Sequence, residues 1–188
     1  LHNFADHLGN DPFLREDILG QLEKVIRHHP SAKAAVDMAL YDLVGKILGI
    51  PVYQLLGLNP LKSLYTSFTI GIDTPAEMAR KAQEASAYPI LKIKVGTKQD
   101  IEILKAIRDV SSATIRVDAN AGWTVKEALK NIEALVPYNI EFVEQPIAAH
   151  DLPGLKMVRE HSPLPIIADE SCVSIHDIPR LSECVDGV

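Results

Sequence analysis

The clearest pattern in the chain is an alternation of short apolar runs with amphipathic segments, from residue 64 onward. The runs have the length and composition of buried β-strands. They lie at residues 64–71, 89–96, 114–120, 140–146 and 165–171. Apolar residues at helical spacing predict helices between them, at 75–86, 101–108, 128–135 and 152–160. Strands alternating with helices favour a parallel sheet with right-handed helical crossovers.

The number of these units bears on the fold. Eight units of about 25 residues would close a TIM-type β/α barrel of about 200 residues. Here five units are followed by a helix at 176–183 and by "VDGV", which reads as the start of a sixth strand. Five parallel strands alone would leave two long unpaired edges, a known aggregation hazard. We therefore expect an α/β fold with part of a modified barrel in residues 63–188, and an incomplete record of a longer protein, which the missing initiating Met also suggests.

The first 62 residues follow a helical pattern instead. Apolar positions predict one helix ending near His28 and a second over residues 31–48, with Ser31 as N-cap and Gly49 ending it. Asn59-Pro60 marks a break, so we place a domain boundary near Lys62. Residues 1–62 then form a separate helical layer.

Composition narrows the classes of function. The chain is 47% hydrophobic and 23% charged, with a net charge of −6, which argues against nucleic acid as a partner. No apolar run is long enough for a membrane span, and the first residues lack a signal-peptide layout, so a cytoplasmic location is the default expectation. Two cysteines, Cys172 and Cys184, are too few for a disulfide framework.

Ionisable residues recur at the ends of the predicted strands, at steps of 24 to 26 residues: Lys94, Asp118, Glu144 and Asp169. Equal steps place them at the C-terminal ends of neighbouring strands, where β/α barrels carry their chemistry. Three carboxylates without His or Cys nearby select Mg²⁺ or Mn²⁺. Strand alternation does not decide whether Asp169 or its neighbour in "DES" is the ligand. Each acid taken singly reads as an ordinary polar strand end, and the joint spacing favours the metal site.

The segment "KIK" suggests a base beside that metal. Lys92 and Lys94 lie two apart on a strand and share a face, and each ammonium group should lower the pKa of the other. An outward-facing surface pair is the alternative for this segment alone. A tuned lysine next to a divalent cation suits abstraction of a proton alpha to a carboxylate, with the cation holding the enediolate. Thr69 lies 25 residues before Lys94, at the same position of its own unit, and one further step predicts a functional residue near position 194.

The segments "LKIKVG", "RVDANAGW", "EFVEQP" and "IADES", in this order and spacing, resemble the enolase superfamily in its muconate lactonizing enzyme subgroup. "SFTIGIDTPAEM" and "DLPGLKMV" are similar to segments of the dipeptide epimerases that act on L-Ala-D/L-Glu. "AAVDMALYDLVGKILGIPVYQLLG" resembles the end of the family's helical capping region. The resemblance implies a modified β/α barrel preceded by the helical end of an α+β capping domain.

The resemblance also implies roles for particular residues. Lys94 matches the family's catalytic base and Lys92 its electrostatic partner. The metal ligands match Asp118, Glu144 and Asp169, and the positions bordering the substrate match Thr69 and Asn120. The implied activity is that of an Mg²⁺-dependent isomerase, an epimerase or racemase that acts on a small carboxylate, with L-Ala-D/L-Glu or a related dipeptide as the expected substrate. A homo-oligomer is expected, and the family's second catalytic lysine would lie on the sixth strand.

Other activities fit the same residues. Muconate cycloisomerase, o-succinylbenzoate synthase and N-succinylamino acid racemase share this half of the site. A Schiff-base aldolase would use a strand lysine covalently and would need no metal, so borohydride trapping at Lys92 or Lys94 would distinguish it. A noncatalytic domain on the same fold would fail to bind Mg²⁺.

Overall fold

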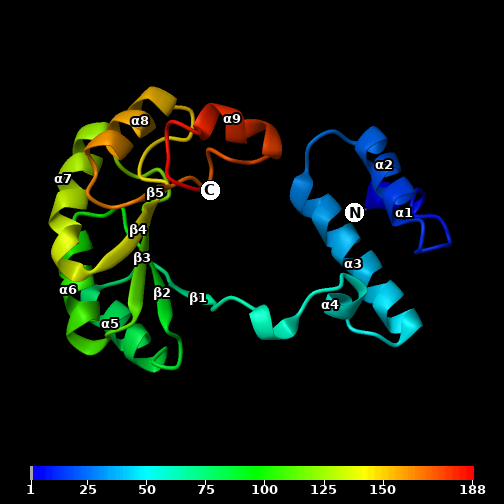
Figure 1. The fold of residues 1–188 in the computed structure, drawn as a ribbon, viewed down its shortest axis with the longest axis horizontal. Helices are drawn as coiled ribbons and strands as arrows, with labels where there is room; N and C mark the ends of the chain where they lie inside the picture. Colours follow the sequence, from blue (N-terminus) through cyan, green and yellow to red (C-terminus); the bar gives the residue numbers. More distant parts are fainter. Residues whose placement is uncertain (1) are drawn as a thin grey trace. The chain divides into compact units, whose positions relative to one another are not determined.

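The computed structural model describes residues 2–188, and the chain divides into two compact units, Leu1–Leu64 and Tyr65–Val188. The division lies close to the boundary expected near Lys62. The first unit is helical (Figure 1). Its elements are α1 (His2–Ala5), α2 (Arg15–Val25), α3 (Pro30–Leu48), α4 (Val52–Leu55) and the 3₁₀ turn η1 (Pro60–Lys62).

The core of the first unit forms between α2 and α3. Ile18 and Leu22 of α2 pack with Val36 and Leu40 of α3, and Phe4 joins them. Both long helices were expected from their apolar spacing. Burial of each such side chain contributes roughly 1.5–3 kcal/mol, so this small cluster accounts for the pairing of the two helices.

The ends of α3 test the capping predictions. Ser31 is not the N-cap, because the helix begins one residue earlier at Pro30, with His29 in the left-handed region at φ 53°. Proline suits the first helical position, since its fixed φ is already helical and its missing N–H would have had no partner there. Gly49 ends the helix at φ 70°, as predicted.

The second unit is a five-stranded parallel sheet in the order β1-β2-β3-β4-β5. The predicted alternation of strand and helix is therefore confirmed. The strands are β1 (Ser67–Ile70), β2 (Ile90–Lys94), β3 (Thr114–Asp118), β4 (Ile140–Glu144) and β5 (Ile166–Ile167). The helices are α5 (Pro75–Glu84), α6 (Asp100–Val110), α7 (Val125–Leu135) with the 3₁₀ turn η2 (Val136–Tyr138), α8 (Leu152–His161) and α9 (Ile178–Leu181).

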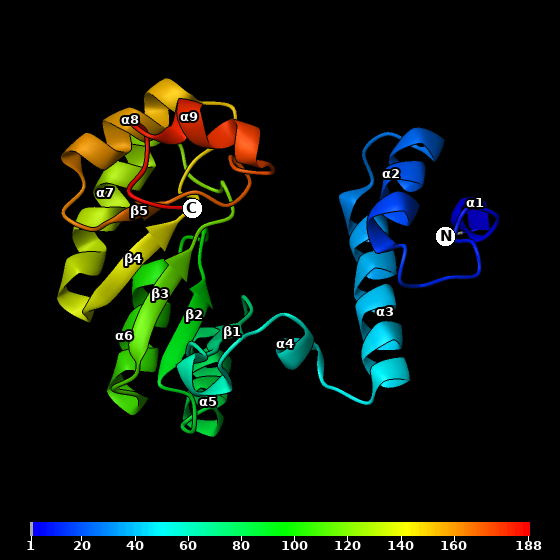
Figure 2. The same cartoon turned by 45° about the vertical axis from the view of Figure 1, so that its right-hand side comes forward.

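Helices α5 to α8 cover one face of the curved sheet (Figure 2). Apolar side chains alternate along the strands toward those helices, as period-2 geometry requires. Leu91 and Ile93 of β2 and Val117 of β3 are fully buried in one cluster with helical residues such as Leu104 and Ile132. The intervening strand positions face the other way. These carry the ionisable residues.

The last strand and helix are shorter than expected. β5 keeps only two residues, Ile166 and Ile167. The helix expected at 176–183 is a 3₁₀ turn (η3, Ile175–Asp177) followed by one turn of α-helix, because Pro179 has no N–H with which to continue a helix from Ile175. Beyond it, Gly187 pairs with Ile167 in a parallel bridge, where a sixth strand was expected to start.

No helix in the part of the chain that the structure describes is long and apolar enough to cross a membrane.

Candidate active site

Three of the four equally spaced residues are direct partners in the sheet. Lys94 pairs with Asp118 across β2 and β3, and Asp118 pairs with Glu144 across β3 and β4. Each is the last residue of its strand. The prediction that equal steps bring these residues to one level is therefore confirmed for this trio.

Two other positions lie off that level. Thr69 pairs with Lys92 rather than with Lys94, so it lies two residues short of the level of Lys94. Glu144 pairs with Ile167, so Asp169 lies two residues beyond its strand partner. Both shifts keep the side-chain face, because they are even numbers of residues. The expectation that Thr69 occupies the level of Lys94 was wrong, since a constant step along the chain does not fix the register between strands.

The three carboxylates nevertheless converge. One oxygen from each of Asp118, Glu144 and Asp169 lies within 4.8 Å of the other two. Oxygens bonded to one octahedral Mg²⁺ at about 2.1 Å lie roughly 3 to 4.2 Å apart, so a modest contraction of the three carboxylates would be needed to hold an ion. Asp118 is fully buried, Glu144 is partly buried and Asp169 is exposed. An anionic group of this kind, all oxygen and open on one side, fits Mg²⁺ or Mn²⁺.

Both lysines reach this cluster. The Nζ atom of Lys92 lies 2.7 Å from Glu144 Oε1 and 2.9 Å from Asp118 Oδ2. The Nζ atom of Lys94 lies 2.6 Å from Asp118 Oδ2 and donates to Asn120 Oδ1 at 2.6 Å. Burial lowers the pKa of Lys92, but its hydrogen bonds to the two carboxylates outweigh burial and raise that pKa. The prediction that the paired ammonium groups lower each other's pKa is therefore wrong for Lys92, because the carboxylates are nearer to it.

The neighbouring acids have pKa values shifted in opposite directions. Burial raises the pKa of Asp118, but hydrogen bonds from Lys94 and Lys92 outweigh it and hold that pKa below its usual range. Burial raises the pKa of Glu144 above its usual range, and the charges of Asp118 and Asp169 raise it further against the bond from Lys92. The cluster brings three carboxylates together with two lysine ammonium groups. A divalent cation among the three oxygens would offset the excess negative charge.

Asn120 follows Asp118 in a tight turn, with Asn120 at φ 43° and Ala121 at φ 61°. Its side chain bridges two groups: Oδ1 accepts from Lys94, and Nδ2 donates to Glu170 Oε1 at 3.1 Å. Of the two acids of "DES", Asp169 joins the carboxylate cluster, while Glu170 accepts a hydrogen bond from Asn120. Asn is among the residues that tolerate positive φ, which suits this turn.

Sequence reasoning missed two polar residues beside the site. Gln145 and Ser171 are almost completely buried and hydrogen-bonded to each other. Both lie within the quoted segments, but a buried polar side chain has no periodic signal that distinguishes it from an exposed one. The burial of these two side chains becomes visible only when their hydrogen-bond partners in the fold are known.

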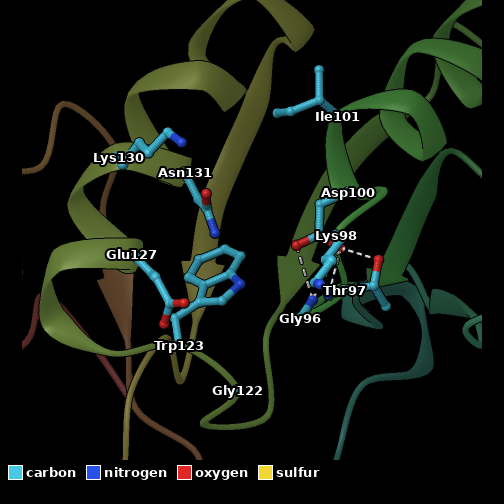
Figure 3. A pocket seen from close by; sticks show the side chains of 10 residues that line it. All are labelled: Gly96, Thr97, Lys98, Asp100, Ile101, Gly122, Trp123, Glu127, Lys130 and Asn131. Carbon is cyan, nitrogen blue, oxygen red and sulfur yellow. Dashed lines mark hydrogen bonds between the residues drawn. The ribbon is translucent and has the colours of Figure 1, made fainter.

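A separate cavity of about 450 Å³ lies between the first turns of α6 and α7 (Figure 3). Trp123 and Asn131 line one side and Lys98 and Asp100 the other. The loops after β2 and β3 touch beneath it, since a Cβ on Gly122 would lie 3.4 Å from the Gly96 Cα atom. None of the three clustered carboxylates lines this cavity. The chemistry of the strand ends is therefore distinct from it.

The strand-end residues, the parallel sheet and the helical unit before it define a class of protein, and comparison with known families gives the same class. Residues 75–188 match the family model described as enolase C-terminal domain-like. Residues 2–57 match the mandelate racemase / muconate lactonizing enzyme N-terminal domain. The chain belongs to the enolase superfamily, in the mandelate racemase / muconate lactonizing enzyme group. The resemblance inferred from the motifs is confirmed.

Curated relatives indicate which members of the superfamily this chain is similar to. The chain is 43% identical over 181 residues to the L-Ala-D/L-Glu epimerase of Bacteroides thetaiotaomicron, covering 95% of this chain and 47% of the relative. It is 46% identical over 180 residues to the hydrophobic dipeptide epimerase of Enterococcus faecalis, covering 93% of this chain and 51% of the relative. The chain thus spans about half the length of the curated relatives it matches.

A solved structure shows the same fold. The dipeptide epimerase of Enterococcus faecalis V583, complexed with Mg and the dipeptide L-Leu-L-Tyr, matches with a TM-score of 0.86 at 42% identity. The match covers 97% of this chain and 54% of that one. The structural neighbours are enolase-superfamily TIM-barrel proteins, so the predicted fold class is confirmed.

Proposed function

We propose that the protein is an Mg²⁺-dependent dipeptide epimerase that removes the proton alpha to a carboxylate and returns it on the opposite face, through an enediolate. The observation that carries this proposal is the convergence of Asp118, Glu144 and Asp169 beside Lys94. The named activities of the relatives, all at about half-length coverage, support the choice of dipeptides.

The three carboxylates would hold the metal ion. Bound there, a divalent cation stabilises the negative charge that develops on the substrate carboxylate, a contribution worth several kcal/mol. Mn²⁺ has the same preference for oxygen ligands and would substitute for Mg²⁺. The charge of the cluster supports this assignment, because three carboxylates lie beside only two lysines and a divalent cation would offset the remaining negative charge.

The two lysines would divide the work. Lys92 bonds two carboxylates and its raised pKa keeps it charged, which suits an electrostatic partner of the substrate carboxylate. Lys94 would take the α-proton, and Asn120, which accepts from its Nζ atom, would orient it. Thr69, exposed beside Lys92, would border the substrate. Inversion also requires a proton donor on the opposite face of the substrate.

A proton-exchange assay on the full-length protein tests the proposal. L-Ala-L-Glu is incubated in D₂O with Mg²⁺, and loss of the α-proton signal of the glutamate residue is followed by NMR. We expect exchange together with formation of the L,D isomer, abolished by EDTA and restored by Mg²⁺. Exchange that continues unchanged in EDTA would contradict the proposal, and lysine trapping by borohydride would then favour the aldolase alternative.

A further inference from the structure

Gln145 follows the metal-site residue Glu144 directly and is fully buried. Every hydrogen-bonding atom of its side chain has a partner. The Oε1 atom accepts from the backbone N–H groups of Asp169 and Ser171, both at 3.0 Å. The Nε2 atom donates to the Ile147 carbonyl oxygen at 2.8 Å and to Ser171 Oγ at 2.9 Å. The two acceptor sites and two donors of an amide are thus used completely.

This network fixes the orientation of the amide. Exchanging the oxygen and nitrogen would place NH₂ against two N–H donors and an oxygen against a carbonyl, so only one orientation satisfies all four bonds. A buried amide with full satisfaction is rigid, and each bond lost would leave a buried group without a partner, at a cost larger than the bond's net value.

The Gln145 side chain continues the hydrogen bonding between the chain segments beyond the last paired residues of β4 and β5. The pairing of β4 with β5 stops at Glu144 and Ile167. Beyond this last pair, the backbone N–H of Gln145 donates to the Ile167 carbonyl oxygen. The Oε1 atom of the Gln145 side chain then accepts a hydrogen bond from the backbone N–H of Asp169. Its own carbonyl accepts from Ala121 at 2.8 Å, in the loop after β3. Gln145 therefore connects the ends of β3, β4 and β5.

Asp169 depends on this connection more than the other two carboxylates do. Asp118 and Glu144 are held within strands by ladder hydrogen bonds on both sides. Asp169 lies outside its two-residue strand and is exposed. The left-handed backbone of Gln145, at φ 36°, is costly for a residue with a side chain, and the surrounding bonds must hold it in place.

We propose that Gln145 is the positioning residue of the metal site, setting Asp169 at binding distance from Glu144 and Asp118. This inference rests on the proposed metal site. The residue would touch neither metal nor substrate and would act through the backbone of Asp169. Outer partners of metal ligands typically contribute 10-fold to 100-fold to metal affinity.

Titration of the full-length protein with Mn²⁺, followed by electron paramagnetic resonance, tests the proposal. The free-ion signal gives the affinity, and the spectrum of the bound ion reports ligand geometry. Gln145→Leu keeps the size of the side chain and removes all four bonds, and we expect a 10-fold to 100-fold weaker affinity with an altered bound-ion spectrum. Gln145→Glu keeps the acceptor for Asp169 and loses the donors, so its loss of affinity should be smaller. Gln145→Glu also tests the proposal by itself if the leucine variant does not fold.

Two controls separate positioning from general weakening. Ser171→Ala removes one acceptor of Nε2 and leaves both backbone bonds to Oε1, so its Mn²⁺ affinity and spectrum should stay near wild type. Ile132→Ala, on the buried face of α7, should destabilise the fold without changing the bound-ion spectrum. Wild-type affinity and spectrum in both Gln145 variants would overturn the proposal, as would an equal loss in Ile132→Ala. Failure of the wild-type protein to bind Mn²⁺ would instead overturn the proposed function.

Discussion

Charged side chains at the two ends of the parallel sheet have different kinds of partners. At the C-terminal ends of the strands, lysines and carboxylates face one another, and the pKa of Glu144 is raised. At the N-terminal ends, Arg108 donates to the backbone carbonyls of Ser111, Ala113 and Tyr138 at 2.7 to 3.1 Å. One end gathers charges around a common point. The other disperses a single charge over carbonyl groups.

This difference separates chemistry from stability within one sheet. The guanidinium of Arg108 is satisfied by backbone carbonyl groups that cannot ionise, so this residue needs no counter-ion from solution. At the opposite end, burial raises the pKa of Glu144, and the charges of Asp118 and Asp169 raise it further. In β/α barrels the C-terminal face carries catalysis and the N-terminal face carries stability. Substitutions at the two ends should therefore affect different measurements.

The largest effect should come from Lys94→Ala. Removing the base should slow exchange of the substrate α-proton by roughly 10² to 10⁴. Mg²⁺ affinity, measured by calorimetry, should stay near wild type because the three carboxylates remain. Unchanged exchange would remove Lys94 from the mechanism.

Arg108→Met should have the next largest effect, on stability alone. It keeps most of the apolar stem but leaves several backbone carbonyls without their donor, and we expect a loss of about 2–3 kcal/mol in the free energy of unfolding. Urea denaturation measures it. Mg²⁺ affinity should not change, and a weakening comparable to that of a ligand substitution would break the separation of the two ends.

Thr124→Ala tests whether nearness to the catalytic loops matters by itself. Thr124 caps α7 in a reciprocal arrangement with Glu127, only six residues after Asp118. Loss of the cap should cost about 1 kcal/mol in unfolding free energy. Proton exchange at saturating Mg²⁺ should be unaffected, because Thr124 faces its own helix. A large loss of exchange in a stably folded variant would show that the loop conformation depends on this cap.

The smallest effect concerns pH and the N-terminal end of β5. Burial raises the pKa of Asp186, but bonds from Arg159 and from the Ile166 N–H outweigh it, so the pKa lies below its usual range. A lowered folded-state pKa gives stability that is present above the unfolded value, about 3.9, and is lost as pH falls through the folded one. Wild type should thus exceed Asp186→Asn in stability at neutral pH, and the difference should shrink in acid. A stability difference between wild type and Asp186→Asn that grows in acid would contradict a lowered pKa of Asp186.

Much of this arrangement could be predicted from sequence, for definable reasons. The period of 24 to 26 residues identified Lys94, Asp118 and Glu144 because strands with ladder partners repeat their geometry. The same argument failed for Thr69, since the register between strands depends on packing rather than on chain length. It also overestimated β5, where the ladder ends after Ile167.

Electrostatics were less predictable than position. Sequence spacing showed that Lys92 and Lys94 share a face, but the direction of the pKa shift of Lys92 depends on which charges lie closest, and those come from β3 and β4. Gln145 was missed for the same reason. Its importance lies in four hydrogen bonds to three residues, up to 26 positions away, which no local pattern contains.

The central claim is that Asp118, Glu144 and Asp169 together bind one divalent cation. A crystal structure of the full-length protein with Mn²⁺, using anomalous scattering to locate the ion, tests it most directly. The account predicts a single strong peak at the strand ends, bonded to one oxygen of each of these three carboxylates at about 2.2 Å. Saturating Mn²⁺ with no peak there, or an ion held by a different set of residues, would contradict it.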